Sequence, residues 1–301
     1  MRTIRSAALV VNAQSRKGRK LFRKARELAR ALPFPVTPYE VRKPGLLDQT
    51  VERALAEKPD LLILGGGDGT MSGLVDHLVG HNVALGVLPL GTANSFARTL
   101  GIPLDLQGAM DVIAAGHFRR IDLGMIDADY FANCAAIGLS PLIAETVPHR
   151  LKAVLGRVGY LIWATWKFMR FKPFTLIVVQ DGEETRMRVV EVRISNGPFH
   201  GGTELVDGAT VDSGEIVVQA VTGHFKRMLI WNWFASFFRL EARHGTVESF
   251  SGKTMTVRTE PPLAISIDGE VLAKTPITAT IAAGVIEVAA PPPDSGPRPT
   301  G

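Results

Sequence analysis

A glycine-rich run in the first part of the sequence has the composition of a phosphate-binding loop. An apolar stretch, residues 61–64, ends in Gly65-Gly66-Gly67-Asp68-Gly69-Thr70. Glycine leaves the backbone bare, so successive N–H groups can approach phosphate oxygens, and a following helix adds positive charge at its N-terminus. Asp68 supplies a carboxylate that can bind Mg²⁺ or accept a hydroxyl proton. A tight turn needs fewer glycines, so the run predicts a phosphate site.

Two commoner phosphate-binding motifs do not fit the sequence. The dinucleotide fingerprint requires its third glycine where Thr70 stands. Ser251-Gly252-Lys253-Thr254 has the ending of a Walker loop, but Val247 occupies the position of the first glycine that this loop requires. We therefore exclude both readings.

A second candidate loop is Pro89-Leu90-Gly91-Thr92-Ala93-Asn94, which also follows an apolar stretch and opens a helical pattern. Gly91 offers bare backbone, and Thr92 and Asn94 offer short side chains that can bind a phosphate or a substrate hydroxyl. Alone, such a segment is an ordinary helix cap. At the same sheet edge as the first loop, it predicts a second wall of one site.

A pair of carboxylates lies near the end of the chain, in Ser266-Ile267-Asp268-Gly269-Glu270. Residues two apart in a strand face the same side, so Asp268 and Glu270 can project together. One ionised carboxylate can act as a general base while the other orients it or binds Mg²⁺. An exposed Asp-Gly hairpin turn explains the same pattern equally well.

The elements that must position these residues follow two different patterns. Over the first 130 residues, apolar strand-like runs alternate with helical patterns, which predicts a doubly wound parallel sheet with ligands at the carboxyl ends of its strands. Beyond that point, short strands bounded by Asp-Gly and Asn-Gly turns predict an antiparallel β domain, with helical patterns at 148–171 and 225–243. We therefore predict a nucleotide domain over residues 1–128, a β domain over 129–290 and a disordered tail over 291–301.

Composition limits the class of protein. The chain has 301 residues, 46% hydrophobic and 21% charged, with a formal net charge of +5 that suits a nucleotide, an anionic lipid surface or nucleic acid. The single cysteine, Cys134, excludes an internal disulfide framework. The apolar runs are shorter than the roughly 18 residues of a spanning helix, and the N-terminal run is shorter than a signal peptide requires. We expect a cytoplasmic protein, and no recognition motif indicates a nucleic-acid partner.

With both loops in view, the chain resembles the diacylglycerol kinase catalytic-domain family, bacterial lipid kinases related to sphingosine and ceramide kinases. The resemblance covers nearly the whole chain and rests on four segments: Gly66-Gly67-Asp68-Gly69-Thr70, Pro89-Leu90-Gly91-Thr92-Ala93-Asn94, Asn12…Ser15…Gly18 and Ile267-Asp268-Gly269-Glu270. It implies an N-terminal domain like those of NAD kinases and phosphofructokinases, followed by an antiparallel β-sandwich. It also implies ATP- and Mg²⁺-dependent phosphorylation of a lipid hydroxyl.

The resemblance assigns roles to individual positions. The nucleotide contacts that it implies fall on Asn12, Gly66, Gly67, Asp68, Gly69, Thr70, Met71, Ser72 and Thr92. With the loop residues Gly65, Gly91 and Asn94, they form the predicted cofactor-binding set. Relatives usually have Asn at the position of Ser72 and Asp at that of Ser95. The proton acceptor falls on Asp268 or Glu270, with Asp68 as a third candidate, and the sequence leaves this choice open.

The resemblance also implies a structural Mg²⁺ site in the second half of the chain. It falls on Thr210, Ser213 and Glu215, with Asp212 as a substitute ligand, because Ser213 stands where relatives have the ligating carboxylate. A polar hairpin loop explains these residues equally well.

The remaining expectation concerns the membrane. All four tryptophans lie in the two helical patterns beside Lys and Arg, which suits the headgroup boundary of an anionic membrane, although helices packed on the β domain fit as well. We expect a lipid substrate and peripheral contact with the inner membrane face, and the sequence leaves a homodimer open. The alternatives are a soluble-substrate kinase of the NAD-kinase type and a non-catalytic nucleotide- or lipid-binding module.

Overall fold

The structure is a computed structural model that describes residues 2–12, 16–41, 43–138, 170–206, 208–223, 247–268 and 270–292. Most of the two predicted helical segments, including all four tryptophans, lies outside these residues, and so does most of the predicted tail. Among the described residues, no helix has the length and apolar character that crossing a membrane requires.

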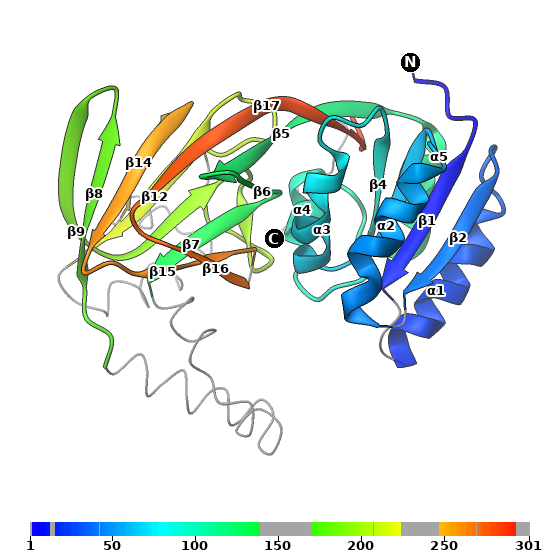
Figure 1. The fold of residues 1–301 in the computed structure, drawn as a ribbon, viewed down its shortest axis with the longest axis horizontal. Helices are drawn as coiled ribbons and strands as arrows, with labels where there is room; N and C mark the ends of the chain where they lie inside the picture. Colours follow the sequence, from blue (N-terminus) through cyan, green and yellow to red (C-terminus); the bar gives the residue numbers. More distant parts are fainter. Residues whose placement is uncertain are drawn as a thin grey trace.

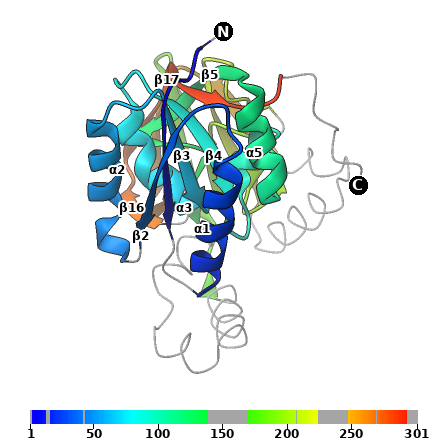
Figure 2. The ribbon, with the colours of Figure 1, turned by 90° about the vertical axis from the view of Figure 1, so that its right-hand side faces the viewer.

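The N-terminal half is built on parallel strands. They follow the order β2 (Val36–Val41), β1 (Ala7–Asn12), β3 (Leu61–Gly66) and β4 (Ala84–Pro89). The helices are α1 (Arg16–Ala29), α2 (Leu47–Ala56), α3 (Asp68–Val75), α4 (Ser95–Thr99) and α5 (Leu106–Ala115), with single 3-10 turns at Pro44–Leu46 and Asp76–Leu78. Figure 2 shows α2 and α3 on one face of this sheet and α1 and α5 on the other.

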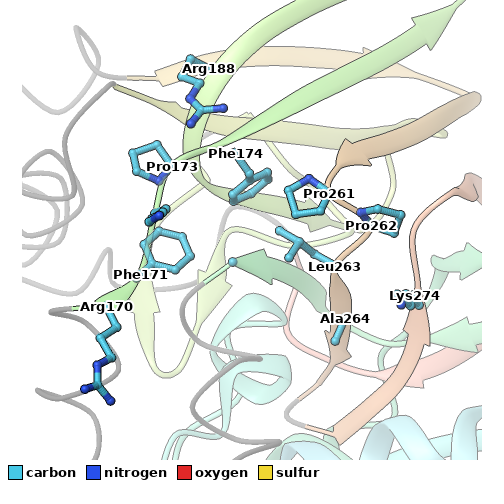
Figure 3. A pocket seen from close by; sticks show the side chains of 12 residues that line it. Arg170, Phe171, Pro173, Phe174, Arg188, Pro261, Pro262, Leu263, Ala264 and Lys274 are labelled. Carbon is cyan, nitrogen blue, oxygen red and sulfur yellow. The ribbon is translucent and has the colours of Figure 1, made fainter.

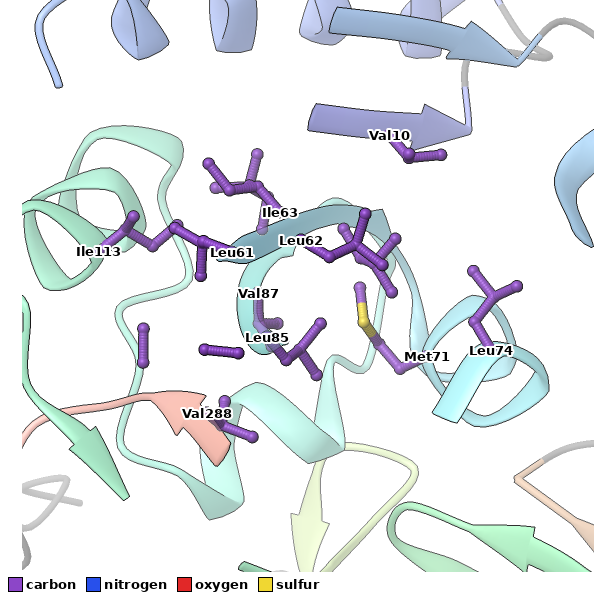
Figure 4. Packing of buried hydrophobic residues seen from close by; sticks show 14 of the residues in the cluster. Val10, Leu61, Leu62, Ile63, Met71, Leu74, Leu85, Val87, Ile113 and Val288 are labelled. Atoms are coloured by element: carbon purple, nitrogen blue, oxygen red, sulfur yellow. The ribbon is translucent and has the colours of Figure 1, made fainter. Parts of the chain in front are cut away.

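Strand β3 lies at the centre of this core, because helices cover both of its faces. Its first four residues are at most 1% exposed. Side chains alternate across a strand, so Leu61 lies beside Ile113 of α5, whereas Leu62 lies toward Met71 and Leu74 of α3 (Figure 4). A strand that is apolar on both faces is typical of a parallel sheet covered by helices.

The C-terminal half consists of antiparallel strands. They are β5 (Phe118–Ile126), β6 (Asp129–Phe131), β7 (Cys134–Gly138), β8 (Phe174–Gln180), β9 (Glu183–Ser195), β12 (Ile216–Thr222), β13 (Val247–Gly252), β14 (Thr254–Glu260), β15 (Ala264–Ile267), β16 (Glu270–Lys274) and β17 (Ile277–Ala289). A separate short hairpin is formed by β10 (Phe199–His200) and β11 (Thr203–Glu204). These strands enclose a second apolar core.

Strand β17 connects the two halves. It pairs antiparallel with β5 and β14, and its last residues pair parallel with β4, so it runs along both halves in Figure 1. The predicted fold class, a parallel α/β half followed by an antiparallel β half, is confirmed. The predicted domain limits at residues 128 and 290 stay a prediction.

Candidate active site

The two glycine loops lie side by side at the carboxyl ends of β3 and β4. The strands are adjacent, with Gly66 opposite Pro89, and the N–H of Leu90 donates to the carbonyl of Gly66 at 2.9 Å. Just after these strands, a Cβ added to Gly91 would lie 2.5 Å from the Cα of Gly67. Real Cβ atoms do not come this close to another carbon atom. Glycine is required here because the two backbones touch.

The first loop turns directly into helix α3. The N–H groups of Thr70 and Met71 both donate to the carbonyl of Gly67 at 3.0 Å, so the helix begins at Asp68. A Cβ on Gly66 would lie 2.4 Å from the Cβ of Thr70, so this glycine lets the helix start immediately after the strand. Free N–H groups at such a start form an anion-binding site.

The Asp68 carboxylate connects the two loops. Its Oδ1 accepts a hydrogen bond from the N–H of Phe96 at 3.1 Å, in the first turn of α4. In the second loop, Asn94 has φ of +48° and is almost fully buried. Its Oδ1 accepts from the N–H of Gly91 at 2.9 Å and its Nδ2 donates to the Gly91 carbonyl at 3.2 Å. The Asn94 side chain therefore shapes its own loop, while Thr92 is exposed beside it.

Asp268 reaches the same place from the other end of the chain. Its Oδ1 accepts from the N–H of Cys134 at 3.0 Å, its Oδ2 accepts from the N–H of Asn133 at 3.3 Å, and Ser72 of α3 also hydrogen-bonds to this carboxylate. Asp268 follows β15 with φ of +44°, so it occupies a turn. The hairpin-turn interpretation of this segment therefore holds, and the catalytic role of Asp268 stays a prediction.

The surroundings of Asp268 favour its protonated form. Burial raises the pKa of its carboxyl from 3.8 to about 6, the three hydrogen bonds oppose this shift, and the negative charge of Asp68 adds to it. The structure thus brings Asp68, Ser72 and Asp268 together. The backbone of Glu270 begins β16, but its side chain lies outside the described residues.

Of the other predicted nucleotide contacts, Asn12 ends β1, one strand away from the first loop. Because parallel strands end at the same sheet edge, Asn12 lies on the loop side of the sheet. Ser15 of the predicted opening lies outside the described residues.

Sequence reasoning missed a hairpin that covers α4. The N–H of Gly202 donates to Ser95 Oγ at 3.0 Å, Asn133 Nδ2 donates to the carbonyl of Phe199, and Thr99 Oγ1 donates to Asn133 Oδ1 at 3.1 Å. Ser95 therefore has a structural partner in this chain.

The same hairpin carries His200. Burial lowers the pKa of its imidazole, and the positive charge of Arg193 lowers this pKa further. The negative charges of Glu191 and Asp68 raise it, so His200 lies within electrostatic reach of Asp68. The only signal in the sequence is a histidine beside Gly201-Gly202.

The predicted metal-binding loop is held together by the Ser213 hydroxyl. Ser213 Oγ lies 3.1 Å from the carbonyl oxygen of Thr210 and 3.2 Å from that of Glu215, and it accepts from the Glu215 N–H at 3.2 Å. The Asp212 carboxylate instead pairs with Arg119 at 2.8 Å. The contacts among the described residues of this loop bring together two carbonyl oxygens and a hydroxyl, which by themselves are a weak set of ligands for Mg²⁺.

The Ser213→Asp variant tests this loop. A carboxylate placed where the two carbonyl oxygens converge should create a Mg²⁺ site, so we expect the Tm of the variant to rise by about 2–5 °C in saturating Mg²⁺. The wild-type Tm and that of Ser213→Ala should not change, as measured by differential scanning fluorimetry with and without EDTA. An equal rise in the wild type would show that Ser213 already serves a bound ion.

Comparisons with known proteins cover both halves of the chain. The family model described as diacylglycerol kinase catalytic domain matches residues 6–126, and the YegS C-terminal NAD kinase beta sandwich-like domain matches residues 134–290. Diacylglycerol kinases of Staphylococcus aureus strains JH9 and Newman are 31% identical over 287 residues, covering 90% of this chain and 87% of each relative.

Solved structures from Bacillus anthracis agree in fold. A diacylglycerol kinase of this organism is 20% identical, with a TM-score of 0.74 over 97% of this chain and 99% of that chain. A second structure assigned to the same kind of enzyme is 24% identical, with a TM-score of 0.79 over 97% of both chains.

Proposed function

The chain belongs to the diacylglycerol kinase family, so it is a lipid kinase that transfers phosphate to an alcohol, and we propose that it phosphorylates a diacylglycerol-like lipid with ATP and Mg²⁺. The observation that carries this proposal is the meeting of the two glycine loops with Asp68 and Asp268. One half of the chain supplies the phosphate-binding backbone and the other half supplies a carboxylate with a raised pKa.

The proposed division of labour follows from this arrangement. The N–H groups at the start of α3 bind the terminal phosphates, and the Asp68 carboxylate would hold Mg²⁺, which would neutralise phosphate charge. Asp268, or Glu270 beside it, takes the proton of the acceptor hydroxyl. The hydroxyl oxygen bonds to the γ-phosphorus as the bond to the bridging oxygen breaks, and ADP leaves. Such transfer requires mainly positioning and charge stabilisation.

A pocket of about 320 Å³ suits the acceptor side of this reaction. It lies between α3 and the β15–β16 hairpin, and Ser72, Ile267 and the exposed Leu272 are among its lining residues. Two further lining residues, Asp76 and Asp129, carry carboxyl groups, which can accept hydrogen bonds from hydroxyl groups and repel anions when ionised. This chemistry favours an uncharged acceptor, such as diacylglycerol, over an anionic one, such as phosphatidylglycerol.

We also infer that the protein works peripherally at the inner face of the membrane. ATP is available on that side, the acceptor lies in the bilayer, and the chain carries a formal net charge of +5 that suits an anionic leaflet.

The experiment that tests the function is incubation with ATP labelled at the γ-phosphate. The acceptors are diacylglycerol, monoacylglycerol, sphingosine and phosphatidylglycerol in detergent micelles, and NAD. We expect label in phosphorylated diacylglycerol and little in phosphorylated phosphatidylglycerol. Labelled NADP would instead identify a kinase of the NAD-kinase type, and ATP binding with no labelled product would identify a non-catalytic module.

The Gly91→Ala variant tests the contact between the two loops. The new Cβ would meet the Cα of Gly67 at 2.5 Å, so the backbones must separate and the phosphate cradle must widen. We expect ATP affinity to fall at least about tenfold, or roughly 1.4 kcal/mol, in isothermal titration calorimetry. Gly73→Ala is the matched control, because nothing lies within 4 Å of a Cβ added there. Equal ATP affinity in both variants would contradict the assignment of Gly91 to the nucleotide site.

A further inference from the structure

A second cavity, of about 600 Å³, is lined by residues at the start of β15 (Figure 3), whereas Asp268 follows the end of that strand. Its walls are the segment that leads into β8, the turn between β14 and β15, and the end of β16. The lining residues that the argument uses are Phe171, Phe174, Leu263, Lys172, Arg188 and Lys274. Ala264 also lines it, and by the rise of a strand it lies about 13 Å from Asp268.

The floor of this cavity is apolar. Figure 3 shows Phe171, Phe174 and Leu263 grouped around it, together with prolines from both flanking segments. The two phenylalanine rings pack edge to face, with centroids 6.3 Å apart and an interplanar angle of 82°. Aromatic and aliphatic groups arranged in this way suit an acyl chain.

The rim of the cavity is basic. Lys172, Arg188 and Lys274 are exposed, and none of the described residues that line the cavity is acidic. Glu260, next to the lining prolines, is ion-paired with Arg186 on the neighbouring strand. Among the described residues of the lining, the rim therefore carries positive charge and no carboxylate.

We propose that this cavity binds an anionic phospholipid of the membrane, separate from the lipid that is phosphorylated. An acyl chain lies against Phe171, Phe174 and Leu263, and the anionic headgroup lies at the basic rim that Lys172, Arg188 and Lys274 form. The combination of an apolar floor with a basic rim fits an anionic amphiphile better than a free anion or a neutral lipid. The proposal rests on the proposed function, because it identifies where a peripheral lipid kinase holds the bilayer that carries its acceptor.

Charge reversal tests the proposal on the full chain. The first variant combines Lys172→Glu, Arg188→Glu and Lys274→Glu. The matched control combines Lys20→Glu, Arg23→Glu and Lys24→Glu. These three residues are exposed on α1, at the far end of the molecule, and their replacement changes the net charge by the same amount. Binding is measured by co-sedimentation with vesicles of phosphatidylcholine, with and without phosphatidylglycerol, after circular dichroism has shown that both variants are folded.

We expect the affinity of the cavity variant for the anionic vesicles to fall about 100-fold or more. Each basic residue near an anionic membrane surface contributes roughly 1 kcal/mol to binding, and three of them are lost. The control should lose several-fold at most. Equal losses in the two variants would overturn the proposal, because binding would then follow net charge alone. Unchanged binding in the cavity variant would overturn it too.

The ligand class is tested with water-soluble probes. Short-chain phosphatidylglycerol below its critical micelle concentration should raise the Tm of the wild type and not that of the cavity variant. An equal rise with inorganic phosphate would overturn the lipid assignment and leave a simple anion site.

Failure of this proposal is distinguishable from failure of the proposed function. The cavity variant should phosphorylate diacylglycerol in neutral detergent micelles at the wild-type rate. A wild type that shows no kinase activity, but whose vesicle binding depends on Lys172, Arg188 and Lys274, would refute the function and keep the lipid site. If the wild type is an active kinase but its vesicle binding does not depend on these three residues, the lipid site is refuted and the proposed function is kept.

Discussion

Replacement of Asp68 by asparagine is expected to reduce lipid phosphorylation by at least about 10³-fold, because the variant loses the only carboxylate of the phosphate-binding loop. The asparagine oxygen can still accept the hydrogen bond that Asp68 Oδ1 receives from the N–H of Phe96, so the connection between the loops should survive. The Tm should therefore stay close to that of the wild type. Initial rates of label transfer to diacylglycerol, measured beside the Tm, test both expectations.

Two further variants complete the Asp68 test. Asp68→Ala removes the charge and the hydrogen bond together, so it should lose the same activity and also some stability. Asp48→Asn, an exposed carboxylate on α2 that contacts His77, should keep the wild-type rate. Retention of more than about a tenth of the activity in Asp68→Asn would remove Asp68 from the reaction, since loss of a group that stabilises charge costs far more.

Replacement of Asp268 by asparagine is the second change with a large expected effect. A general base contributes about 10²–10⁴-fold, so the rate of label transfer should fall by that factor. The pH profile adds a signature, because a base with a pKa of about 6 must be deprotonated to act. The wild-type rate should therefore rise as the pH passes through about 6, and Asp268→Asn should lose this limb of the profile.

Glu270→Gln is the matched comparison for Asp268→Asn, because the sequence leaves the choice between the two carboxylates open. Loss of the pH limb in Glu270→Gln, with the limb intact in Asp268→Asn, would make Glu270 the base. Asp268 would then be a positioning residue.

The same pKa has a consequence for stability. The folded chain binds the Asp268 proton more tightly than the unfolded chain does, so the contribution of this group is most favourable below pH 3.8 and is lost as the pH rises to about 6. Asp268→Asn removes a buried charge and should not lower the free energy of unfolding at pH 8. Urea unfolding at pH 8 and pH 4 measures this difference between the variant and the wild type.

The N-terminal half of the fold was predictable because its signals are local. Each of β1, β2, β3 and β4 is a short apolar or alternating run followed by a helical pattern, which indicates a parallel sheet. The meeting of residues 65–70 with residues 89–94 follows from the adjacency of β3 and β4, since connected parallel strands commonly neighbour each other.

For the C-terminal half, the sequence predicted the fold class, an antiparallel β domain, but not the pairing of its strands. The turn dipeptides indicate antiparallel strands, but they do not indicate where each strand ends or which strands it pairs with. Strand β17 continues from Ile277 to Ala289. Its last part pairs with β4 and β5, and contacts over about 200 residues leave no trace in a local pattern.

Contacts over long sequence separations also explain what sequence reasoning missed in the site. Asp268 is fixed by the N–H groups of Asn133 and Cys134, at separations of 135 and 134 residues. His200 approaches Asp68 only because the β10–β11 hairpin is hydrogen-bonded onto α4. Asp212, a plausible ligand in the sequence, is instead paired with Arg119, 93 residues away.

The proposed mechanism requires Asp68 and Asp268 to face each other in one site, and carboxyl-¹³C NMR titration of labelled aspartates tests this pairing most directly. The Asp268 signal should titrate with a pKa of about 6 in the wild type, because of burial and, in addition, the charge of Asp68. In Asp68→Asn, where that charge is gone, its pKa should fall. A wild-type pKa near 3.8 that does not change in Asp68→Asn would contradict the account, because the two carboxylates would then not share one site.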